Sequence, residues 1–272
     1  FSAIAELIDN TYDPDVNAEQ IWIDKTQIKD MECLTFKDNG NGLSRKIMHQ
    51  ILSFGFSIEK GIQPIGIYGN GFTSGSMRLG KDVIILSKSK NDLCVGMLSQ
   101  TYLKKIRAKH IAVPIISFNK QEADNVMEKH QASLRDILDH SPFNTEEELL
   151  TELRAIESSG SSTGTKIIIW NLHRTSEGNT ELDFTTENDI RIPCDDSDTS
   201  VPESHSSLRA YCSILYLKPS MQINIRGQKV EDRPIYKSLD YINRSYCYKP
   251  KTLVSFSSRH RNFQAFPCRR NH

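Results

Sequence analysis

Glycine is concentrated in one part of the chain, and this clustering constrains the fold more than any other feature of the sequence. Seven of the fourteen glycines fall between residues 55 and 80, at positions 55, 61, 66, 69, 71, 75 and 80. Because glycine tolerates backbone conformations that other residues avoid, we expect a mobile loop here that opens into a helix over Phe72–Arg78. Backbone N–H groups at the start of such a helix can bind phosphates.

Two familiar nucleotide-binding motifs do not account for this glycine pattern. The run Gly66-Ile67-Tyr68-Gly69-Asn70-Gly71 resembles a dinucleotide fingerprint, but no predicted strand leads directly into it. The phosphate loop that ends in Gly-Lys-Ser or Gly-Lys-Thr is absent from the sequence. What remains is a glycine-rich loop placed before a helix.

The first segment, FSAIAELIDNTYD, has the spacing of an amphipathic helix. Apolar residues recur every three or four positions and form one face, made of Phe1, Ile4, Ala5 and Ile8. Glu6 and Asn10 are four residues apart on the other side, so their side chains project from the same face. A carboxylate can take a proton from an attacking water, and an amide oxygen can bind Mg²⁺. Taken alone, two such residues are more often an ordinary solvated face.

A second polar group follows two short predicted strands, Ile21–Ile23 and Leu34–Phe36. Asp38 ends the second strand, and Gly40 and Gly42 follow it in a tight turn. A carboxylate at this place can accept a hydrogen bond from the exocyclic amine of adenine, and glycines allow a purine to approach the backbone. Thr165, just before a predicted strand at Lys166–Trp170, could support the same pocket. By itself, Asp-x-Gly-x-Gly is a common turn.

The rest of the chain alternates strands with a polar insertion. Further strands are predicted at Val83–Leu86, Val95–Leu98 and Ile111–Ile116, and the insertion spans about 119–157 with a helix over Glu146–Ile156. The acidic, serine-rich stretch 193–207 is typical of a linker. A helix at Leu208–Leu217 and a strand at Met221–Ile225 then predict that a second domain begins near residue 208.

Composition narrows the function classes. Lys+Arg and Asp+Glu are both 34, so bulk charge does not indicate a nucleic-acid partner. Six cysteines without a Cys-x-x-Cys pair favour free thiols over disulfides or a zinc site. No apolar stretch approaches the roughly 20 residues of a membrane helix, so no membrane partner is expected. The sequence begins at Phe1 inside a predicted helix, which suggests a truncated start.

The order of these motifs resembles the GHKL superfamily of ATPases. The series comprises a helical Glu-x-x-x-Asn, then Asp-x-Gly-x-Gly, then a glycine-rich loop, then Gly-Thr before a strand. Longer segments over about residues 1–251 look specifically like MORC proteins: FSAIAELIDN, LTFKDNGNG, LSFGFS, YGNGF-x-SGSMRLGKD, LSQTYL, KIIIWNL and SLRAYCSILYLKP-x-MQI.

The resemblance implies an α/β fold, the Bergerat-type GHKL sandwich. In it, helices cover one face of a mixed, mainly antiparallel sheet, and the nucleotide lies between helix and sheet. It further implies an ATP-binding domain over 1–192, the linker 193–207, the start of a transducer-like α+β domain over 208–254, and a non-family tail over 255–272. MORC proteins are nuclear chromatin ATPases. The implied ligands and partners are ATP, Mg²⁺, chromatin or DNA, and a second copy in an ATP-dependent homodimer.

The resemblance also assigns roles to residues. Glu6 would be the general base and Asn10 the Mg²⁺ ligand. The residues expected to contact the nucleotide are Asn10, Asp38, Gly40, Gly42, Ser57, Lys60, Ile67, Tyr68, Gly69, Asn70, Gly71, Phe72, Thr73 and Thr165. Among them, Asp38 and its two glycines would form the adenine site, and the loop from Ile67 to Phe72 would close over the phosphates.

Several departures from the family pattern point to an incomplete or degenerate copy. Thr73 stands where the family usually has lysine, and a hydroxyl cannot replace an ammonium facing a polyphosphate. The N-terminal arm, a lysine-bearing strand expected after Val254, the CW-type zinc finger and the coiled coil are not found. The alternative to a slow ATPase is therefore a degenerate module that acts through protein or DNA contacts. A histidine kinase is disfavoured, because His49 and His173 lie in no dimerisation-helix context.

Overall fold

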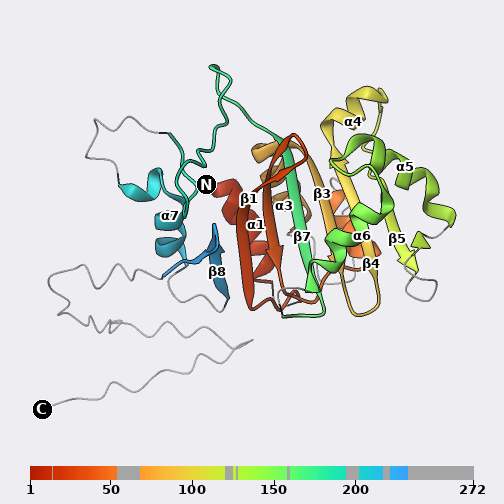
Figure 1. Ribbon diagram of the computed structural model, residues 1–272, viewed down its shortest axis with the longest axis horizontal. Coiled ribbons are helices and arrows are strands. Elements are labelled where there is room, and N and C mark those ends of the chain that lie inside the picture. Colours follow the sequence, from red (N-terminus) through yellow and green to blue (C-terminus); the bar gives the residue numbers. More distant parts are fainter. Residues whose placement is uncertain are drawn as a thin grey trace, which may run out of the picture. The chain divides into compact units, whose positions relative to one another are not determined.

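A computed structural model of the chain describes residues 1–13, 15–53, 68–119, 125–126, 128–157, 160–193, 202–216 and 221–231. These residues lie in one compact unit, Phe1–Ile235. Within this described part, nine strands form a single sheet in the order β6-β5-β4-β3-β7-β2-β1-β8-β9 (Figure 1).

The strands are β1 (Gln20–Ile28), β2 (Met31–Asp38), β3 (Gly80–Lys88), β4 (Leu93–Ser99), β5 (Ile115–Asn119), β6 (Asn125–Val126), β7 (Gly164–Leu172), β8 (Gln222–Ile225) and β9 (Gln228–Lys229). The α-helices are α1 (Ser2–Thr11), α2 (Arg45–Leu52), α3 (Tyr68–Leu79), α4 (Gln100–Lys105), α5 (Gln131–His140), α6 (Glu146–Arg154) and α7 (Leu208–Leu215). Two 3₁₀ turns are η2 (Glu128–His130) and η4 (Glu203–His205).

The sheet is mixed and mainly antiparallel, as predicted. Every neighbouring pair is antiparallel except β1 and β8, which run parallel from the pair Gln20–Gln222 to the pair Ile23–Ile225. Strand residues point alternately to the two faces of a sheet. The α/β class is therefore confirmed, and the alternation decides which side chains meet which helices.

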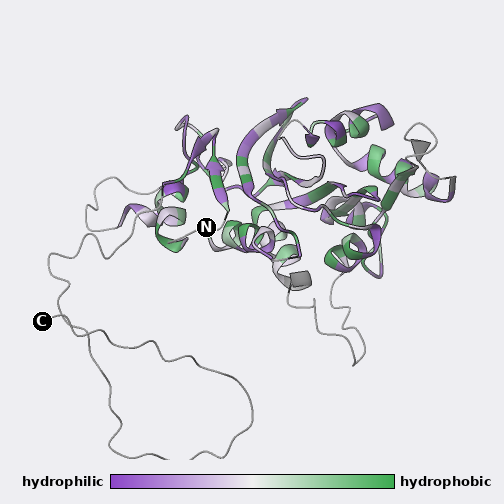
Figure 2. Cartoon of the chain, turned by 90° about the horizontal axis from the view of Figure 1, so that it is seen from below, coloured by the Kyte–Doolittle hydropathy of each residue, from purple (hydrophilic) through white to green (hydrophobic). Residues whose placement is uncertain are grey.

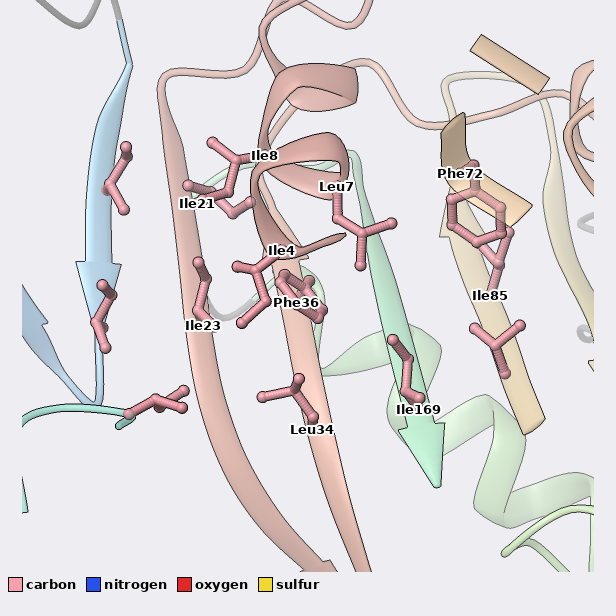
Figure 3. Close-up of a cluster of buried hydrophobic side chains, with 14 of the residues drawn as sticks. Ile4, Leu7, Ile8, Ile21, Ile23, Leu34, Phe36, Phe72, Ile85 and Ile169 are labelled. Atoms are coloured by element: carbon pink, nitrogen blue, oxygen red, sulfur yellow. The ribbon is translucent and has the colours of Figure 1, made fainter. Parts of the chain in front are cut away.

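One face of the sheet is covered by α1, α2, α3 and α7. The buried cluster on this face joins Ile4, Leu7 and Ile8 of α1 to strand residues such as Ile21 and Phe36. Figure 3 shows these α1 side chains pointing toward the strands. The apolar spacing that predicted the first helix thus also predicts its buried side.

A second helical layer covers the other face, which the sequence analysis did not anticipate. Leu134 of α5 and Leu149 and Leu153 of α6 join a separate buried cluster with Ile84 of β3 and Ile168 of β7. Figure 1 shows α6 lying across β3 and β4 on this face, and Figure 2 shows helices on both sides of the strands, with hydrophobic segments in green. The polar insertion is therefore a structural layer of the sandwich.

The predicted elements are found, with shifted ends. The strand predicted at Ile111–Ile116 begins only at Ile115. Ile111 is 46% exposed, and Pro114 has no N–H to donate to a ladder, so the chain joins the sheet after the proline. None of the helices in the described part of the chain has the length and hydropathy to span a bilayer.

The segment after the predicted linker shares the first sheet and core. β8 pairs with β1, and Leu208, Cys212, Ile223 and Ile225 belong to the same buried cluster as α1. The division into domains at 193–207 stays a prediction. The described cysteines, Cys33, Cys94 and Cys212, are buried free thiols, as expected.

Candidate functional site

Asp38 is a buried carboxylate at the end of β2, on the face that packs against α1, α2 and α3. It alternates with Leu34 and Phe36, which belong to that core. The strand register places it between Ile21 of β1 and Thr165 of β7. Its side chain is only 7% exposed, so the fold removes an ionisable group from water at this point.

Main-chain amides hold this carboxylate. Its Oδ1 accepts hydrogen bonds from the backbone N–H of Gly40 (2.9 Å) and of Thr165 (3.3 Å). Burial raises the pKa of Asp38 from 3.8 to about 6, and the two amide hydrogen bonds oppose that rise. No hydrogen bond from the described residues ends on Oδ2, so this oxygen can accept a donor from a ligand.

Hydroxyls of two neighbouring strands continue the polar row. Thr165 and Ser87 face each other across β7 and β3, with their oxygens 3.2 Å apart, and the Ser87 hydroxyl accepts from the backbone N–H of Leu43 at 2.7 Å. The sequence analysis named Thr165 and missed Ser87. The missed signal is a polar residue that continues the helix-facing side of β3 directly after the apolar residues Val83 and Ile85.

The turn after Asp38 requires its glycines. A Cβ at Gly40 would lie 2.5 Å from the carbonyl oxygen of Val16, and one at Gly42 would lie 2.2 Å from that of Lys88. Gly42 also has φ +69°, a conformation that other residues rarely adopt. Asn39 fixes the turn, because its side-chain oxygen accepts from the backbone N–H groups of Glu19 and Gln20.

Glu6 lies where α1 meets the first turns of α3. A Cβ at Gly71 would be 2.6 Å from Oε2 of Glu6, so the carboxylate rests directly against the α3 backbone. Gly75 allows the same close packing one turn later, with Ala3 O 3.0 Å from a Cβ placed there. The predicted base and the glycine-rich helix are thus brought together.

Asn10 is one turn further along α1 and is half-buried. Its Nδ2 is buried without a hydrogen-bond partner among the described residues. Buried amides normally find partners, so this nitrogen can donate a hydrogen bond to a ligand oxygen, whereas a metal ion would be bound by the side-chain oxygen. No group of three or more His, Cys, Asp or Glu residues in the described ranges could hold a metal by itself.

Other predicted site residues are placed differently. Phe72 is 4% exposed and packs in the core near Ile85 (Figure 3), and its contact with a nucleotide stays a prediction. Thr73 is fully buried, and its hydroxyl donates to the carbonyl of Ile51 in α2 at 3.1 Å. Its side chain therefore contacts α2, and a direct role at the phosphates stays a prediction.

The other predicted site residues lie in or next to the range 54–67. Ser57, Lys60 and Ile67 lie outside the described residues, and Tyr68, Gly69 and Asn70 are described only as the backbone of the first turn of α3. A cavity of about 730 Å³ opens beside the turn, lined by Asn41, Gly42, Ser44, Ile47, Lys88, Ser89, Lys90, Asn91, Asp92, Glu157, Ser162 and Thr163. Neither Glu6 nor Asp38 lines it, so it does not define the predicted nucleotide site.

Two protein-family models match this chain. Residues 1–132 match the model of the histidine kinase-, DNA gyrase B- and HSP90-like ATPases, and residues 206–265 match the Morc6 ribosomal protein S5 domain 2-like model. The first match contains Glu6, Asn10 and Asp38 together. It agrees with the fold class predicted from their order.

Two curated relatives belong to the same family as the second model. The chain is 54% identical to MORC family CW-type zinc finger protein 3 of Mus musculus, over 93% of this chain and 28% of that protein. It is 33% identical to the human ATPase MORC2, over 95% of this chain and 25% of that protein. Among solved structures, it is similar to the ATPase and transducer domains of DNA topoisomerase II from Balamuthia mandrillaris. That match has a TM-score of 0.42 and 10% identity over 87% of this chain and 49% of that chain.

The chain spans about a quarter of the length of these curated relatives. The likeness covers both ends of the described part, from the Glu6 helix to the segment around α7 and β8. With the two family models and the identities above, the chain belongs to the MORC family, within the GHKL ATPases.

Proposed function

We propose that this chain is the ATP-binding module of a nuclear, chromatin-associated MORC-type protein and that it hydrolyses ATP slowly. The observation that carries the proposal is the buried Asp38 carboxylate with its two backbone donors. With a pKa of about 6 it is ionised at neutral pH. It then accepts a hydrogen bond from the exocyclic amine of adenine, which guanine lacks at the equivalent position.

Glu6 and Asn10 supply the two other functions of the proposed site. The Glu6 carboxylate lies against Gly71 near the start of α3, where helix N–H groups favour phosphate, so it can take a proton from a water beside the γ-phosphate. The Asn10 oxygen suits Mg²⁺, which protein sites typically hold through one or two side chains plus phosphates and waters. Bound Mg²⁺ would neutralise developing phosphate charge.

Slow turnover is expected because position 73, where the family usually has lysine, carries a threonine. Phosphoryl transfer depends on groups that spread the developing charge, and losing one such contact typically costs about 100- to 1000-fold in rate, by analogy with an oxyanion-hole donor. Thr73 supplies no charge, and its hydroxyl is bonded to Ile51.

The test of nucleotide binding is a comparison of ATP with GTP. A ligand that binds only the folded state raises the melting temperature, so a nonhydrolysable ATP analogue with Mg²⁺ should raise it and the GTP analogue should not. In Asn10→Ala, the Mg²⁺-dependent part of the shift should disappear. Equal shifts with both nucleotides would contradict recognition by Asp38.

The test of hydrolysis is Glu6→Gln, which retains the shape and removes the base. We expect phosphate release to fall at least tenfold while the ATP shift is retained. Glu19→Gln is the matched control, because Glu19 is an exposed glutamate outside the site. Unchanged phosphate release in Glu6→Gln would exclude Glu6 as the base.

The second candidate is a module that binds partners without turnover, and the buried Thr73 favours it. Under this alternative, ATP raises the melting temperature only slightly. Neither Thr73→Lys nor a grafted second domain then increases phosphate release. An increase from either change supports the ATPase. Nuclear location, DNA or chromatin binding and ATP-dependent homodimerisation belong to the proposal through family membership, and they are tested with the full-length protein.

A further inference from the structure

Helix α1 carries Glu6 and Asn10 but has few local determinants of its own position. Its last turn carries no basic side chain that would favour the helix dipole. Most helical stability in proteins comes from the packing of an amphipathic face against other elements. The direction in which Glu6 and Asn10 point therefore depends on what holds α1 from outside.

Tyr216, directly after α7, contacts α1 over two turns. Its hydroxyl donates to Oδ1 of Asp9 at 2.8 Å and approaches the carbonyl of Ala5 at 3.4 Å. Its ring stacks on Tyr12, with ring centroids 5.2 Å apart and planes inclined by 6°. Because residues spaced by four and three share one side of a helix, Ala5, Asp9 and Tyr12 form a single stripe under Tyr216.

The stripe of Ala5, Asp9 and Tyr12 lies beside the side of α1 that carries Glu6 and Asn10, the residues of the proposed nucleotide chemistry. Glu6 and Asn10 each follow a member of the stripe by one residue, which is about 100° around the helix. A rotation or slide of α1 that breaks the contact with Tyr216 must therefore move Glu6 and Asn10 as well. At the other end of the helix, Phe1 lies against Tyr211 of α7 at 5.6 Å, so α7 holds α1 near both ends.

We propose that Tyr216 is a positioning residue of the nucleotide site, which sets the orientation of α1 and couples α7 to Mg²⁺ and base function. This inference rests on the proposed ATPase function. The hydrogen bond is donated by a hydroxyl to a carboxylate, which is among the stronger kinds. Tyr216 acts through α1, with Asp9 as its acceptor.

The environment keeps Tyr216 in the donating form. Burial, followed by the hydrogen bond to Asp9, raises the pKa of the Tyr216 hydroxyl well above its usual value. Burial also raises the pKa of the stacked Tyr12 to about 12. Both tyrosine hydroxyls therefore stay protonated throughout the physiological pH range, so the Tyr216 hydroxyl remains a hydrogen-bond donor there.

The test is Tyr216→Phe in the full 272-residue chain, which keeps the ring stack and removes the hydroxyl. The matched control is Tyr102→Phe, because the Tyr102 hydroxyl also donates to a carboxylate, Asp136 at 3.0 Å, on the opposite face of the sheet. The main readout is the gain in affinity for a nonhydrolysable ATP analogue on adding Mg²⁺. Phosphate release, as kcat against KM, is the second readout.

We expect Tyr216→Phe to reduce the Mg²⁺-dependent gain by about tenfold, the size of one hydrogen bond to a charged group. Because KM approximates the dissociation constant when chemistry is slow, KM should rise to a similar extent, and kcat should fall as well. Tyr102→Phe should lower the melting temperature to a similar extent and leave both readouts unchanged. Asp9→Ala should have the same effect as Tyr216→Phe. The double variant of Asp9→Ala and Tyr216→Phe should lose no more than either single variant. Asp9→Asn keeps an acceptor oxygen and should behave like the unaltered chain.

The outcomes separate the two proposals. If the unaltered chain binds the analogue with a Mg²⁺-dependent gain and Tyr216→Phe does the same, the positioning role is wrong and the proposed function stands. Equal losses in Tyr216→Phe and Tyr102→Phe would reduce Tyr216 to a general structural residue. If the unaltered chain binds no ATP analogue, there is no nucleotide site to position, and both proposals are overturned.

Discussion

Asp38 illustrates a conflict between stability and function at a single residue. Burial opposes its ionisation, while the amides of Gly40 and Thr165 favour the charged form without cancelling that cost. A pKa raised from 3.8 to about 6 means that ionised Asp38 destabilises the fold by about 3 kcal/mol at pH values above 6. A residue with this cost is best explained by a ligand that needs its charge.

Asp38→Asn should therefore stabilise the protein and weaken ATP binding. The amide oxygen can still accept from Gly40, and the buried charge is removed, so we expect the free energy of unfolding at pH 7.5 to rise by about 1–3 kcal/mol. The ATP-dependent rise in melting temperature should shrink. Asp30→Asn, at an exposed turn, is the control and should change neither quantity.

The same carboxylate predicts a pH dependence. Because the folded-state pKa is raised, the unaltered protein binds a proton more readily when folded, and Asp38 lowers its stability progressively as pH rises from about 4 to about 6. The stability difference between Asp38→Asn and the unaltered chain should thus be near zero at pH 4 and full above pH 6. ATP affinity should fall below pH 6, as the acceptor is protonated. A constant difference across this range, measured by denaturant titration, would exclude Asp38 as the titrating group.

At the scale of elements, the packing of α1 on α3 depends on glycine. Gly75 permits the approach of Ala3, and Gly71 permits the approach of the Glu6 carboxylate. Glycine inside a helix normally lowers its stability relative to alanine. Glycine at these two positions therefore lowers the stability of α3 but allows α1, which carries the proposed base, to pack closely against it. α3 is also the helix expected to bind phosphate.

Gly71→Ala should separate stability from activity. The added methyl group would meet only the mobile end of Glu6, which can move aside, and the helix gains about 0.5–1 kcal/mol from the better propensity of alanine. The displaced carboxylate should lower phosphate release severalfold while the melting temperature holds or rises. Ser74→Ala, on the exposed side of α3, is the control for a substitution in this helix that leaves Glu6 in place, although it also removes the hydrogen bond from the Ser74 hydroxyl to the Gly71 carbonyl (3.3 Å). Full activity in Gly71→Ala would mean that Glu6 does not act from the position seen here.

At the scale of the whole described unit, the late segment completes the early core. Ile225 of β8 is fully buried in the same cluster as Ile23 of β1, and the two strands pair in parallel. Arg209 of α7 adds hydrogen bonds to the carbonyls of Asn188, Ile225 and Lys229. The nucleotide-site helix thus packs on a core to which α7 and β8 contribute.

Ile225→Ala should consequently destabilise the whole unit. Truncating a fully buried isoleucine typically costs about 2–5 kcal/mol, and we expect a single unfolding transition at a lower temperature. Tryptophan fluorescence, which reports Trp22 of β1 and Trp170 of β7, and far-ultraviolet circular dichroism should shift together. Ile106→Ala, at a side chain that is 46% exposed, should have little effect. Separate transitions from the two probes would show that the described residues do not unfold as one cooperative unit.

The sequence by itself predicted the central helices and strands and the order of the chemical motifs, whereas α4, β6 and β9 were not predicted. Periodicity is a local property, so α1 and the central parts of β1, β2, β3, β4 and β7 were predicted from it, and the motif order indicated the family. The side of α1 that carries Glu6 and Asn10 also follows from four-residue spacing. These features depend only on neighbours along the chain.

Only the tertiary structure decided what surrounds each of these residues. The pairing of Asp38 with Thr165 joins positions 127 apart, and the contacts of Tyr216 with Ala5 and Asp9 join positions more than 200 apart. No local pattern reports strand register across such distances, or that α5 and α6 cover the second face. In the same way, the burial of Phe72 and Thr73 could not be predicted. A glycine-rich helix has no clear amphipathic period that would identify the side on which α2 and the sheet pack.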